Sequence, residues 1–411
     1  GSRDQCDRRC EISVMEIEGK PHPFGGACNK YYNLQHGLRD DSDHLDLVAV
    51  RQALLFEKYA APSTPADRPP KRRIGFNRSF LIHAYYPLYS TFFAELEGEP
   101  FLADACPQAG MDEQGASFCY PAQLAHGFFC SLLNPEHRLD YIFLPHVKAL
   151  PNQGNARDSQ TCPFVQGEAF YLKSTFRARL QALQKDGLKV LTPLIDLTDG
   201  LEAMEKPLCA AARTMGIGKT SARTAFRKAL RKQKAFFDEM QKKGRESLAD
   251  LESHPHDRAV VIFGRFYSGL TAEANKGIQR MLASRGCKVI PLDFLPLDDQ
   301  PNKKHMYWGT GQQIMKAAAF VKKHRQLFGA YITNFSCGPD SFLLTYFRDI
   351  MGEKPSLTLE LDSHTAGAGL DIQDPIGGSL EQYRATRDEI ESAVLGLRAY
   401  VEATCKGVAD S

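Results

Sequence analysis

Short apolar segments alternate with longer amphipathic segments from about residue 71 to the end of the chain. The short segments have the length and composition of strands, and the longer ones have the spacing of helices. Strands that alternate with helices predict mostly parallel sheets covered by helices on both faces. The predicted strands are residues 73–76, 139–145, 188–194, 259–263, 288–292, 329–332 and 357–359. The predicted helices are residues 45–59, 85–96, 122–133, 219–243, 270–285, 309–325 and 378–403. We therefore expect an α/β protein whose ligands bind beyond the carboxyl ends of the strands.

Two proline-containing segments divide the chain. Residues 61–70 contain four prolines, too many for a helix or a central strand, and residues 254–256 read His-Pro-His. They predict a Cys-containing N-terminal segment (1–35), a helix with a Pro-rich linker (36–70), a first α/β domain (71–253) and a second α/β domain (254–411).

Charge and hydropathy exclude several classes of protein. A net charge of +2 gives no reason to expect nucleic acid or an anionic membrane as a partner. No apolar run approaches the roughly 18 residues that a membrane span needs. The first residues, Gly-Ser-Arg-Asp, lack the apolar core of a signal peptide and resemble an expression scar on a trimmed chain. We expect a cytoplasmic protein.

The chain contains 11 cysteines, an odd and high number. Cytosolic chains rarely form disulfides, so this surplus favours metal ligands or redox chemistry. Three cysteines each lie just before a predicted helix: Cys119, Cys162 and Cys337. Unpaired N–H groups and the helix dipole favour a thiolate at such a position. All three would lie at the carboxyl edge of a sheet, two in the first domain and Cys337 in the second. That placement suits a cluster in the cleft between the domains, and three separate buried thiols are the alternative.

Three cysteines around a [4Fe–4S] cubane would leave one iron without a protein ligand. That iron could bind substrate, as the open position of a catalytic zinc site does. Cys106 and Cys130 are additional candidate ligands if the cofactor is larger than one cubane.

Other residues are weaker candidates. Cys6, Cys10 and Cys28 could form a zinc knuckle, hold a small cluster or remain unliganded. Asp362 and His364 follow the last predicted strand, where they could contact substrate or provide a proton, or merely close the loop.

Several motifs resemble the 2-hydroxyacyl-CoA dehydratase and benzoyl-CoA reductase superfamily. The opening motifs are residues 73–78, 86–89 and 91–96. Later motifs resemble one branch, the large acyl-CoA dehydratase activase-related proteins and their relatives, the double-cubane cluster proteins. These are residues 118–121, 125–127, 161–163, 165–167, 264–267, 333–342 and 362–365.

The resemblance implies two flavodoxin-like (Rossmann-like) domains and three cysteine ligands per cubane. It assigns Cys119, Cys162 and Cys337 to a [4Fe–4S] cluster or a double-cubane [8Fe–9S] cluster. It also implies an ATP-hydrolysing activase that supplies low-potential electrons, either as a separate chain or as fused domains missing here.

The leading hypothesis is therefore the iron–sulfur catalytic component of an activase-driven reductase or of a 2-hydroxyacyl-CoA dehydratase-like system. Its substrate would be a small molecule, with a CoA thioester as one candidate, and a second copy of the chain is a further candidate partner. One alternative is a non-catalytic electron-relay or activase-docking module. The other is a zinc-stabilised α/β binding protein.

Overall fold

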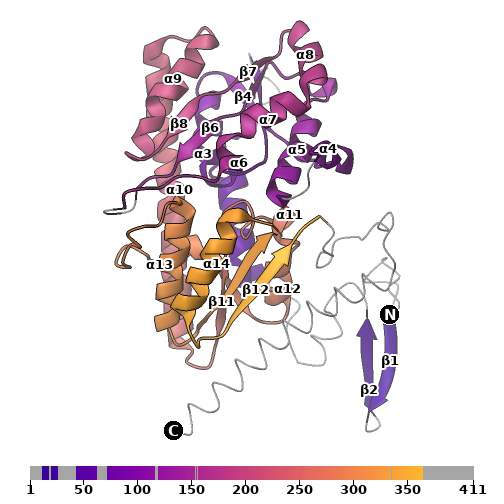
Figure 1. The fold of residues 1–411 in the computed structure, drawn as a ribbon, viewed down its shortest axis with the longest axis vertical. Coiled ribbons are helices and arrows are strands. Elements are labelled where there is room, and N and C mark those ends of the chain that lie inside the picture. The colour runs from indigo at the N-terminus through magenta and orange to yellow at the C-terminus, as the bar shows by residue number, and fades with distance from the viewer. Residues whose placement is uncertain are drawn as a thin grey trace.

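The computed structural model describes residues 12–17, 20–25, 43–62, 72–115, 119–152, 154, 156–334 and 336–363, the first two ranges as backbone alone. Within them the chain forms two four-stranded parallel sheets, one above the other in Figure 1. The first sheet has the order β4-β3-β5-β7, and the second has the order β10-β9-β11-β12. In both, the first strand of the series lies between the second and the third, which is the flavodoxin-like order. The α/β class and the flavodoxin-like topology are thus confirmed.

The strands are short. The first sheet consists of β3 (Arg72–Phe76), β4 (Gly98–Leu102), β5 (Tyr141–Phe143) and β7 (Lys189–Leu191). The second consists of β9 (Ala259–Phe263), β10 (Lys288–Pro291), β11 (Leu327–Asn334) and β12 (Ser356–Leu361). A parallel pair, β6 (His146–Ala149) and β8 (Leu194–Asp196), extends from the first sheet. An antiparallel hairpin joins β1 (Ile12–Ile17) and β2 (Lys20–Gly25).

Helices pack on both sheets. Those that follow strands of the first sheet are α3 (Ile82–Ala94), α4 (Gln108–Asp112), α5 (Tyr120–Leu132), α6 (Pro163–Gln166), α7 (Glu168–Thr175), α8 (Arg177–Lys185), α9 (Glu205–Thr214) and α10 (Lys219–Ser253). Those of the second are α11 (Ala272–Asn275), α12 (Ile278–Ser284), α13 (Gly309–Lys323) and α14 (Gly338–Met351). The earlier helix α2 (Leu47–Ala53) continues as a π-helical turn, η2 (Leu54–Lys58), and packs against β10. The short 3₁₀ turns are η1 (Asp43–Leu45), η3 (Pro135–His137), η4 (Leu201–Met204) and η5 (Leu292–Phe294).

A buried proline interrupts the backbone hydrogen bonding of α3. Pro87 has no N–H, so it leaves the carbonyl of His83 without its helical donor. Arg51 donates from Nη2 to that carbonyl at 3.0 Å. One residue along, Gln233 of α10 donates to the Ala84 carbonyl at 2.9 Å and accepts from the Leu88 N–H at 3.1 Å. Side chains from two other helices thus satisfy the groups that the proline frees, and they fix α3 in place.

Helix α10 connects the two sheets (Figure 1). It packs along α3 of the first sheet and against η5, which follows β10 of the second. At Gly244 the helix approaches Phe294 so closely that a Cβ atom would lie 1.7 Å from the Phe294 carbonyl oxygen. Only glycine fits this backbone contact.

The predicted strands are present, with changes at their ends. Residues 139–145 and 188–194 each contain a proline, and there the strand of the sheet stops and β6 or β8 begins. Strand β4 was not predicted. The predicted helix 270–285 is divided into α11 and α12 because Lys276 and Gly277 adopt positive φ. The predicted helix 378–403 lies outside the described residues. No helix in the described part of the chain is long and apolar enough to cross a membrane.

Candidate functional site

Each of the three predicted cysteines precedes a helix directly. Cys119 is the residue before α5, Cys162 the residue before α6 and Cys337 the residue before α14. The carbonyl of each accepts a hydrogen bond from the first turn of its helix. Cys119 and Cys162 are buried and Cys337 is half-buried. Two thiols therefore come from the helices of the first sheet and one comes from the second, as the sequence predicted.

The three thiols share one electrostatic neighbourhood. Burial raises the pKa of Cys119 to about 11, and the nearby Cys162 thiol acts in the same direction. Burial raises the pKa of Cys337 to about 12, and Cys119 again contributes to the increase. The cation of Arg265 opposes both shifts without cancelling them. For Cys119 and Cys337, desolvation therefore outweighs the favourable effect that a helix N-terminus has on a thiolate.

Arg265 is the centre of the site on the second sheet. It follows β9, next to Cys337 beyond the end of β11, at the point where the strand order of this sheet reverses. Its side chain is 2% exposed. Nη2 donates to the Cys337 sulfur at 2.8 Å, to the Asp340 carboxylate at 2.8 Å and to the Asn334 side chain at 3.2 Å. A buried cation thus lies directly beside a thiol.

Asp340 balances this cation. Its side chain is buried, and besides Arg265 it accepts hydrogen bonds from Tyr331, at 3.2 Å, and from Thr333. Burial alone would lower the pKa of Arg265, but Asp340 and Cys337 hold it well above its ordinary value. The guanidinium therefore remains charged although it is buried. Its Nε is buried without a hydrogen-bond partner in the described residues.

The backbone at Gly264 allows Arg265 to reach this position. Gly264 has φ +138°, a conformation that residues with a side chain rarely adopt. A Cβ atom there would lie 2.6 Å from the carbonyl oxygen of Ile332 in β11. The glycine lets the chain turn tightly out of β9 while it stays against the neighbouring strand.

Aromatic rings close the junction between the sheets. The Tyr267 ring lies beneath the Arg265 guanidinium, whose central carbon is 5.2 Å from the ring centre. The same ring packs edge to face on Phe80, with the ring centroids 5.0 Å apart. Phe80 follows β3, so this contact joins the carboxyl edges of the two sheets. Tyr171 of α7 is half-buried near Cys119 and Cys162, and the burial of its hydroxyl together with these neighbours raises its pKa well above its ordinary value.

A buried carboxyl group occupies the corresponding edge of the first sheet. Glu168, the first residue of α7, accepts hydrogen bonds from Asn77 at 2.9 Å and from Ser79, both of which follow β3. Burial raises the pKa of Glu168 to about 7, despite the lowering effect of these two donors. A carboxyl with this pKa can hold or release a proton near neutral pH. No sequence pattern points to Glu168, because a glutamate in a first helical turn usually faces solvent.

The remaining candidate residues lie apart from this junction or outside the described residues. Cys130 lies 11 residues after Cys119, two residues before the end of α5 and roughly 16 Å along the helix axis. There it accepts a hydrogen bond from Arg179 at 3.0 Å, and Cys106 is its neighbour, so neither thiol joins the three. Asp362 follows β12 close to Lys276 and Tyr120. Cys6, Cys10, Cys28 and His364 lie outside the described residues.

The donor set does not suit a single ion. In the part of the chain that the structure describes, no three His, Cys, Asp or Glu side chains are grouped to hold one metal ion. A tetrahedral ion with bonds of about 2.3 Å to sulfur needs its ligands within roughly 4 Å of one another.

A family model described as "CoA enzyme activase uncharacterised domain (DUF2229)" matches residues 73–295, which is more than half of the chain. The match includes Cys119 and Cys162, Glu168 and Arg265, and it ends before Cys337. No curated protein matches the chain, and no solved structure does.

Proposed function

This chain belongs to the family described as CoA enzyme activase uncharacterised domain, and from that membership we propose that it is the iron–sulfur component of an activase-driven system. The system would be a low-potential reductase or would resemble a 2-hydroxyacyl-CoA dehydratase. The family description fits such systems in general, and the iron–sulfur role is the finer proposal.

One observation carries this proposal. Cys119, Cys162 and Cys337 directly precede three helices and come from two sheets. The Cys162 thiol contributes to the raised pKa of Cys119, and Cys119 contributes to the raised pKa of Cys337. Buried cysteines scattered through a core would not be expected to meet in this way at the carboxyl edges of two parallel sheets, where ligands bind.

Each residue of the site has a role in this proposal. Cys119, Cys162 and Cys337 would hold a [4Fe–4S] or double-cubane cluster, which when bound supplies one-electron transfer. The Arg265 cation offsets the negative charge of thiolate ligands, and its bond to the Cys337 sulfur orients that side chain. Phe80, Tyr171 and Tyr267 exclude water, and the Glu168 carboxyl holds a proton close by.

The partner in this proposal is an ATP-hydrolysing activase that delivers electrons to the cluster. The substrate is a small molecule, and a CoA thioester is the candidate that the family description favours.

Iron and acid-labile sulfide measured on protein purified without oxygen test the proposal. We expect about four irons per chain for a cubane or about eight for a double cubane. Cys119→Ala, Cys162→Ala and Cys337→Ala should each lower the iron content and change the absorption spectrum. Cys130→Ala is the matched control. Cys130 lies near the far end of α5, the helix that Cys119 precedes, and is therefore away from the junction.

The same measurements separate the alternatives. If the protein contains zinc and no iron, and if its zinc content is unchanged in all three variants, the proposal is contradicted. That result would favour a zinc-stabilised binding protein. The electron-relay module would be favoured by a different result. The activase would still reduce the cluster, but no small substrate would change its absorption spectrum or reduction potential.

A further inference from the structure

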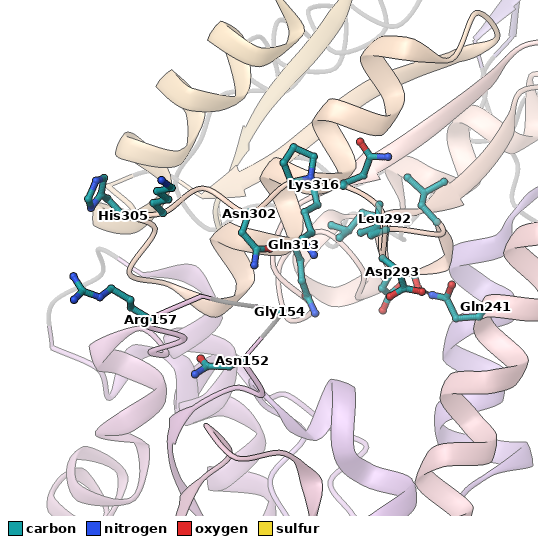
Figure 2. A pocket seen from close by; sticks show the side chains of 16 residues that line it. Asn152, Gly154, Arg157, Gln241, Leu292, Asp293, Asn302, His305, Gln313 and Lys316 are labelled. Atoms are coloured by element: carbon teal, nitrogen blue, oxygen red, sulfur yellow. Dashed lines mark hydrogen bonds between the residues drawn. The ribbon is translucent and has the colours of Figure 1, made fainter.

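A cavity of about 1090 Å³ lies between the loop after β6 and the first turns of α13 (Figure 2). Its lining contains cations and carboxylates together, among them Lys304, Lys316, Asp293 and Asp298. Since charges of both signs line this cavity, its electrostatics select no class of ligand.

A smaller cavity, of about 610 Å³, has a more specific lining. It opens between the segment that precedes α4 and the last turns of α5. Cys106 comes from the segment and Cys130 from α5, and both are half-buried. The exposed Arg179 of α8 completes the lining beside them. Two thiols and a cation therefore line one space that reagents in solution can enter.

Two glycines bring the thiols together where α4 packs on α5. A Cβ atom on Gly127 would lie 2.4 Å from the Cys106 sulfur, and one on Gly110 would lie 2.4 Å from the Cβ atom of Cys130. Gly127 precedes Cys130 by three residues in α5, and Cβ positions three apart in a helix are roughly 5–6 Å from each other. The Cys106 sulfur therefore lies within roughly 8 Å of the Cys130 Cβ atom.

A disulfide between these residues requires a small movement. Its Cβ atoms must lie roughly 3.5–4.5 Å apart, so Cys106 has to approach α5 by a few ångströms. Residues 103–107, which contain Cys106, form a loop between β4 and α4. The movement thus falls on a loop and leaves α5 in place.

The two thiols have different surroundings. Arg179 donates from Nη1 to the Cys130 sulfur at 3.0 Å and from Nη2 to the Cys130 carbonyl at 3.2 Å. A cation beside a sulfur stabilises the thiolate, which is the form that attacks oxidants. The Cys106 thiol instead donates to the Leu124 carbonyl at 3.6 Å, and burial raises the pKa of this thiol to about 12. Cys130 is therefore the nucleophile of the pair, and Cys106 is its protonated partner.

We propose that Cys106 and Cys130 form an oxidation site that reacts with hydrogen peroxide. The Cys130 thiolate attacks one peroxide oxygen, the O–O bond breaks and hydroxide leaves, so that Cys130 becomes a sulfenic acid. The Cys106 sulfur then attacks the Cys130 sulfur and the S–O bond breaks. Water leaves, formed from the sulfenic hydroxyl group and the Cys106 proton.

One peroxide is thus reduced by two electrons while two thiols are oxidised to one disulfide, which an external thiol can reduce again. This site is separate from Cys119, Cys162 and Cys337 and does not depend on the proposed function.

Hydrogen peroxide added to the whole chain, purified without oxygen, tests the proposal. Peptide-resolved mass spectrometry should find a Cys106–Cys130 disulfide that dithiothreitol reverses. In Cys106→Ser the sulfenic acid should persist on Cys130, where dimedone traps it, and in Cys130→Ser the Cys106 thiol should remain reduced. The half-buried Cys209 of α9 is the internal control and should be oxidised more slowly than Cys130. Because the peptides are read directly, oxidation of a bound cluster does not contribute to the signal.

A second variant tests the role of the cation. Arg179→Gln should slow the oxidation of Cys130 by about twofold to fivefold, which is the effect of an exposed charge contact. Arg177→Gln is the matched control, since Arg177 is exposed on the same helix, and it should leave the rate unchanged. The proposal is overturned if no Cys106–Cys130 disulfide forms or if Cys130 is oxidised no faster than Cys209. It is overturned as well if Arg179→Gln reacts at the rate of the natural chain.

Discussion

The Arg265 guanidinium lies 2.8 Å from the sulfur of Cys337 and 2.8 Å from the carboxylate of Asp340, and both contacts are made by the same nitrogen. A cation shared in this way ties the position of the thiol to a buried ion pair. Both ionic side chains are almost fully enclosed, at 2% and 1% exposed. The pair is therefore screened little by solvent, and disturbing either partner should have a large effect.

Arg265→Gln should lower the free energy of unfolding by about 3–5 kcal/mol, because it leaves the Asp340 carboxylate buried without its cation. Urea unfolding followed by circular dichroism measures the loss. Lys148→Gln is the control. It removes an ion pair with Asp196 whose side chains are 49% and 37% exposed, and it should change the free energy of unfolding much less than Arg265→Gln does. If both variants lose the same free energy of unfolding, the burial of the Arg265–Asp340 pair does not make it more important than an exposed ion pair.

Glu168→Gln should make the protein more stable above neutral pH. The pKa of the folded carboxyl is about 7 against 4.5 as its ordinary value, so the folded state binds the proton more tightly. The contribution of Glu168 to stability is present below pH 4.5 and is lost as the pH rises to 7. The difference amounts to about 3 kcal/mol.

Gln should be a good replacement, because its oxygen can still accept the hydrogen bonds from Asn77 and Ser79. Unfolding measured from pH 4.5 to 8 should show a smaller decline for Glu168→Gln than for the natural chain. Parallel curves for the two proteins would show that folding does not raise the pKa of this carboxyl.

Cys119 and Cys337 should react much more slowly with a thiol reagent in the folded protein than in the unfolded protein. In metal-free protein at pH 8, Cys119 and Cys337 should react slowly with iodoacetamide, since their pKa values of about 11 and about 12 leave little thiolate. Peptide-resolved mass spectrometry gives the labelled fraction of each. The same protein unfolded in guanidinium chloride is the control, and there both should react readily. Rapid labelling of either one in the folded protein would indicate a thiolate.

Gly244→Ala should destabilise the protein by about 3 kcal/mol or more, because the new methyl group would meet the Phe294 backbone and neither chain can move freely. Gly218→Ala, at the start of the same helix, is the control. A Cβ atom there has open space around it, so the cost should be limited to the weaker helix N-cap, about 1 kcal/mol. Thermal unfolding compares the two, and a mild effect at Gly244 would mean that α10 can shift away from η5.

Much of the fold could be predicted from the sequence because it depends on local patterns. Apolar runs bounded by Gly and Pro indicate strands such as residues 259–263, and the alternation with helices indicates parallel sheets. Strand β4, Gly98–Leu102, was missed because only Phe101 and Leu102 in it are large and apolar. The placement of Cys119, Cys162 and Cys337 at helix starts was also predictable, since each lies between a loop and an amphipathic segment.

The rest of the site depends on contacts between distant parts of the chain. Arg265 lies 75 residues from Asp340, and Glu168 lies 91 residues from Asn77. Neither pair has a spacing that a sequence pattern reveals. The raised pKa values of Cys119 and Cys337 could not be predicted either, because a helix N-terminus can be recognised in a sequence whereas the degree of desolvation cannot.

The hydrogen bonds that Gln233 makes to α3 near Pro87 have a consequence for the order in which the protein folds. The two backbone groups that Gln233 satisfies lie 145 and 149 residues before it in the chain. At a synthesis rate of 5–20 residues per second, roughly 7–30 s separate the appearance of α3 from that of its partner. During that interval α3 remains incomplete and the first sheet lacks one of its covering helices. The first half of the nascent chain therefore waits for α10 before it can close.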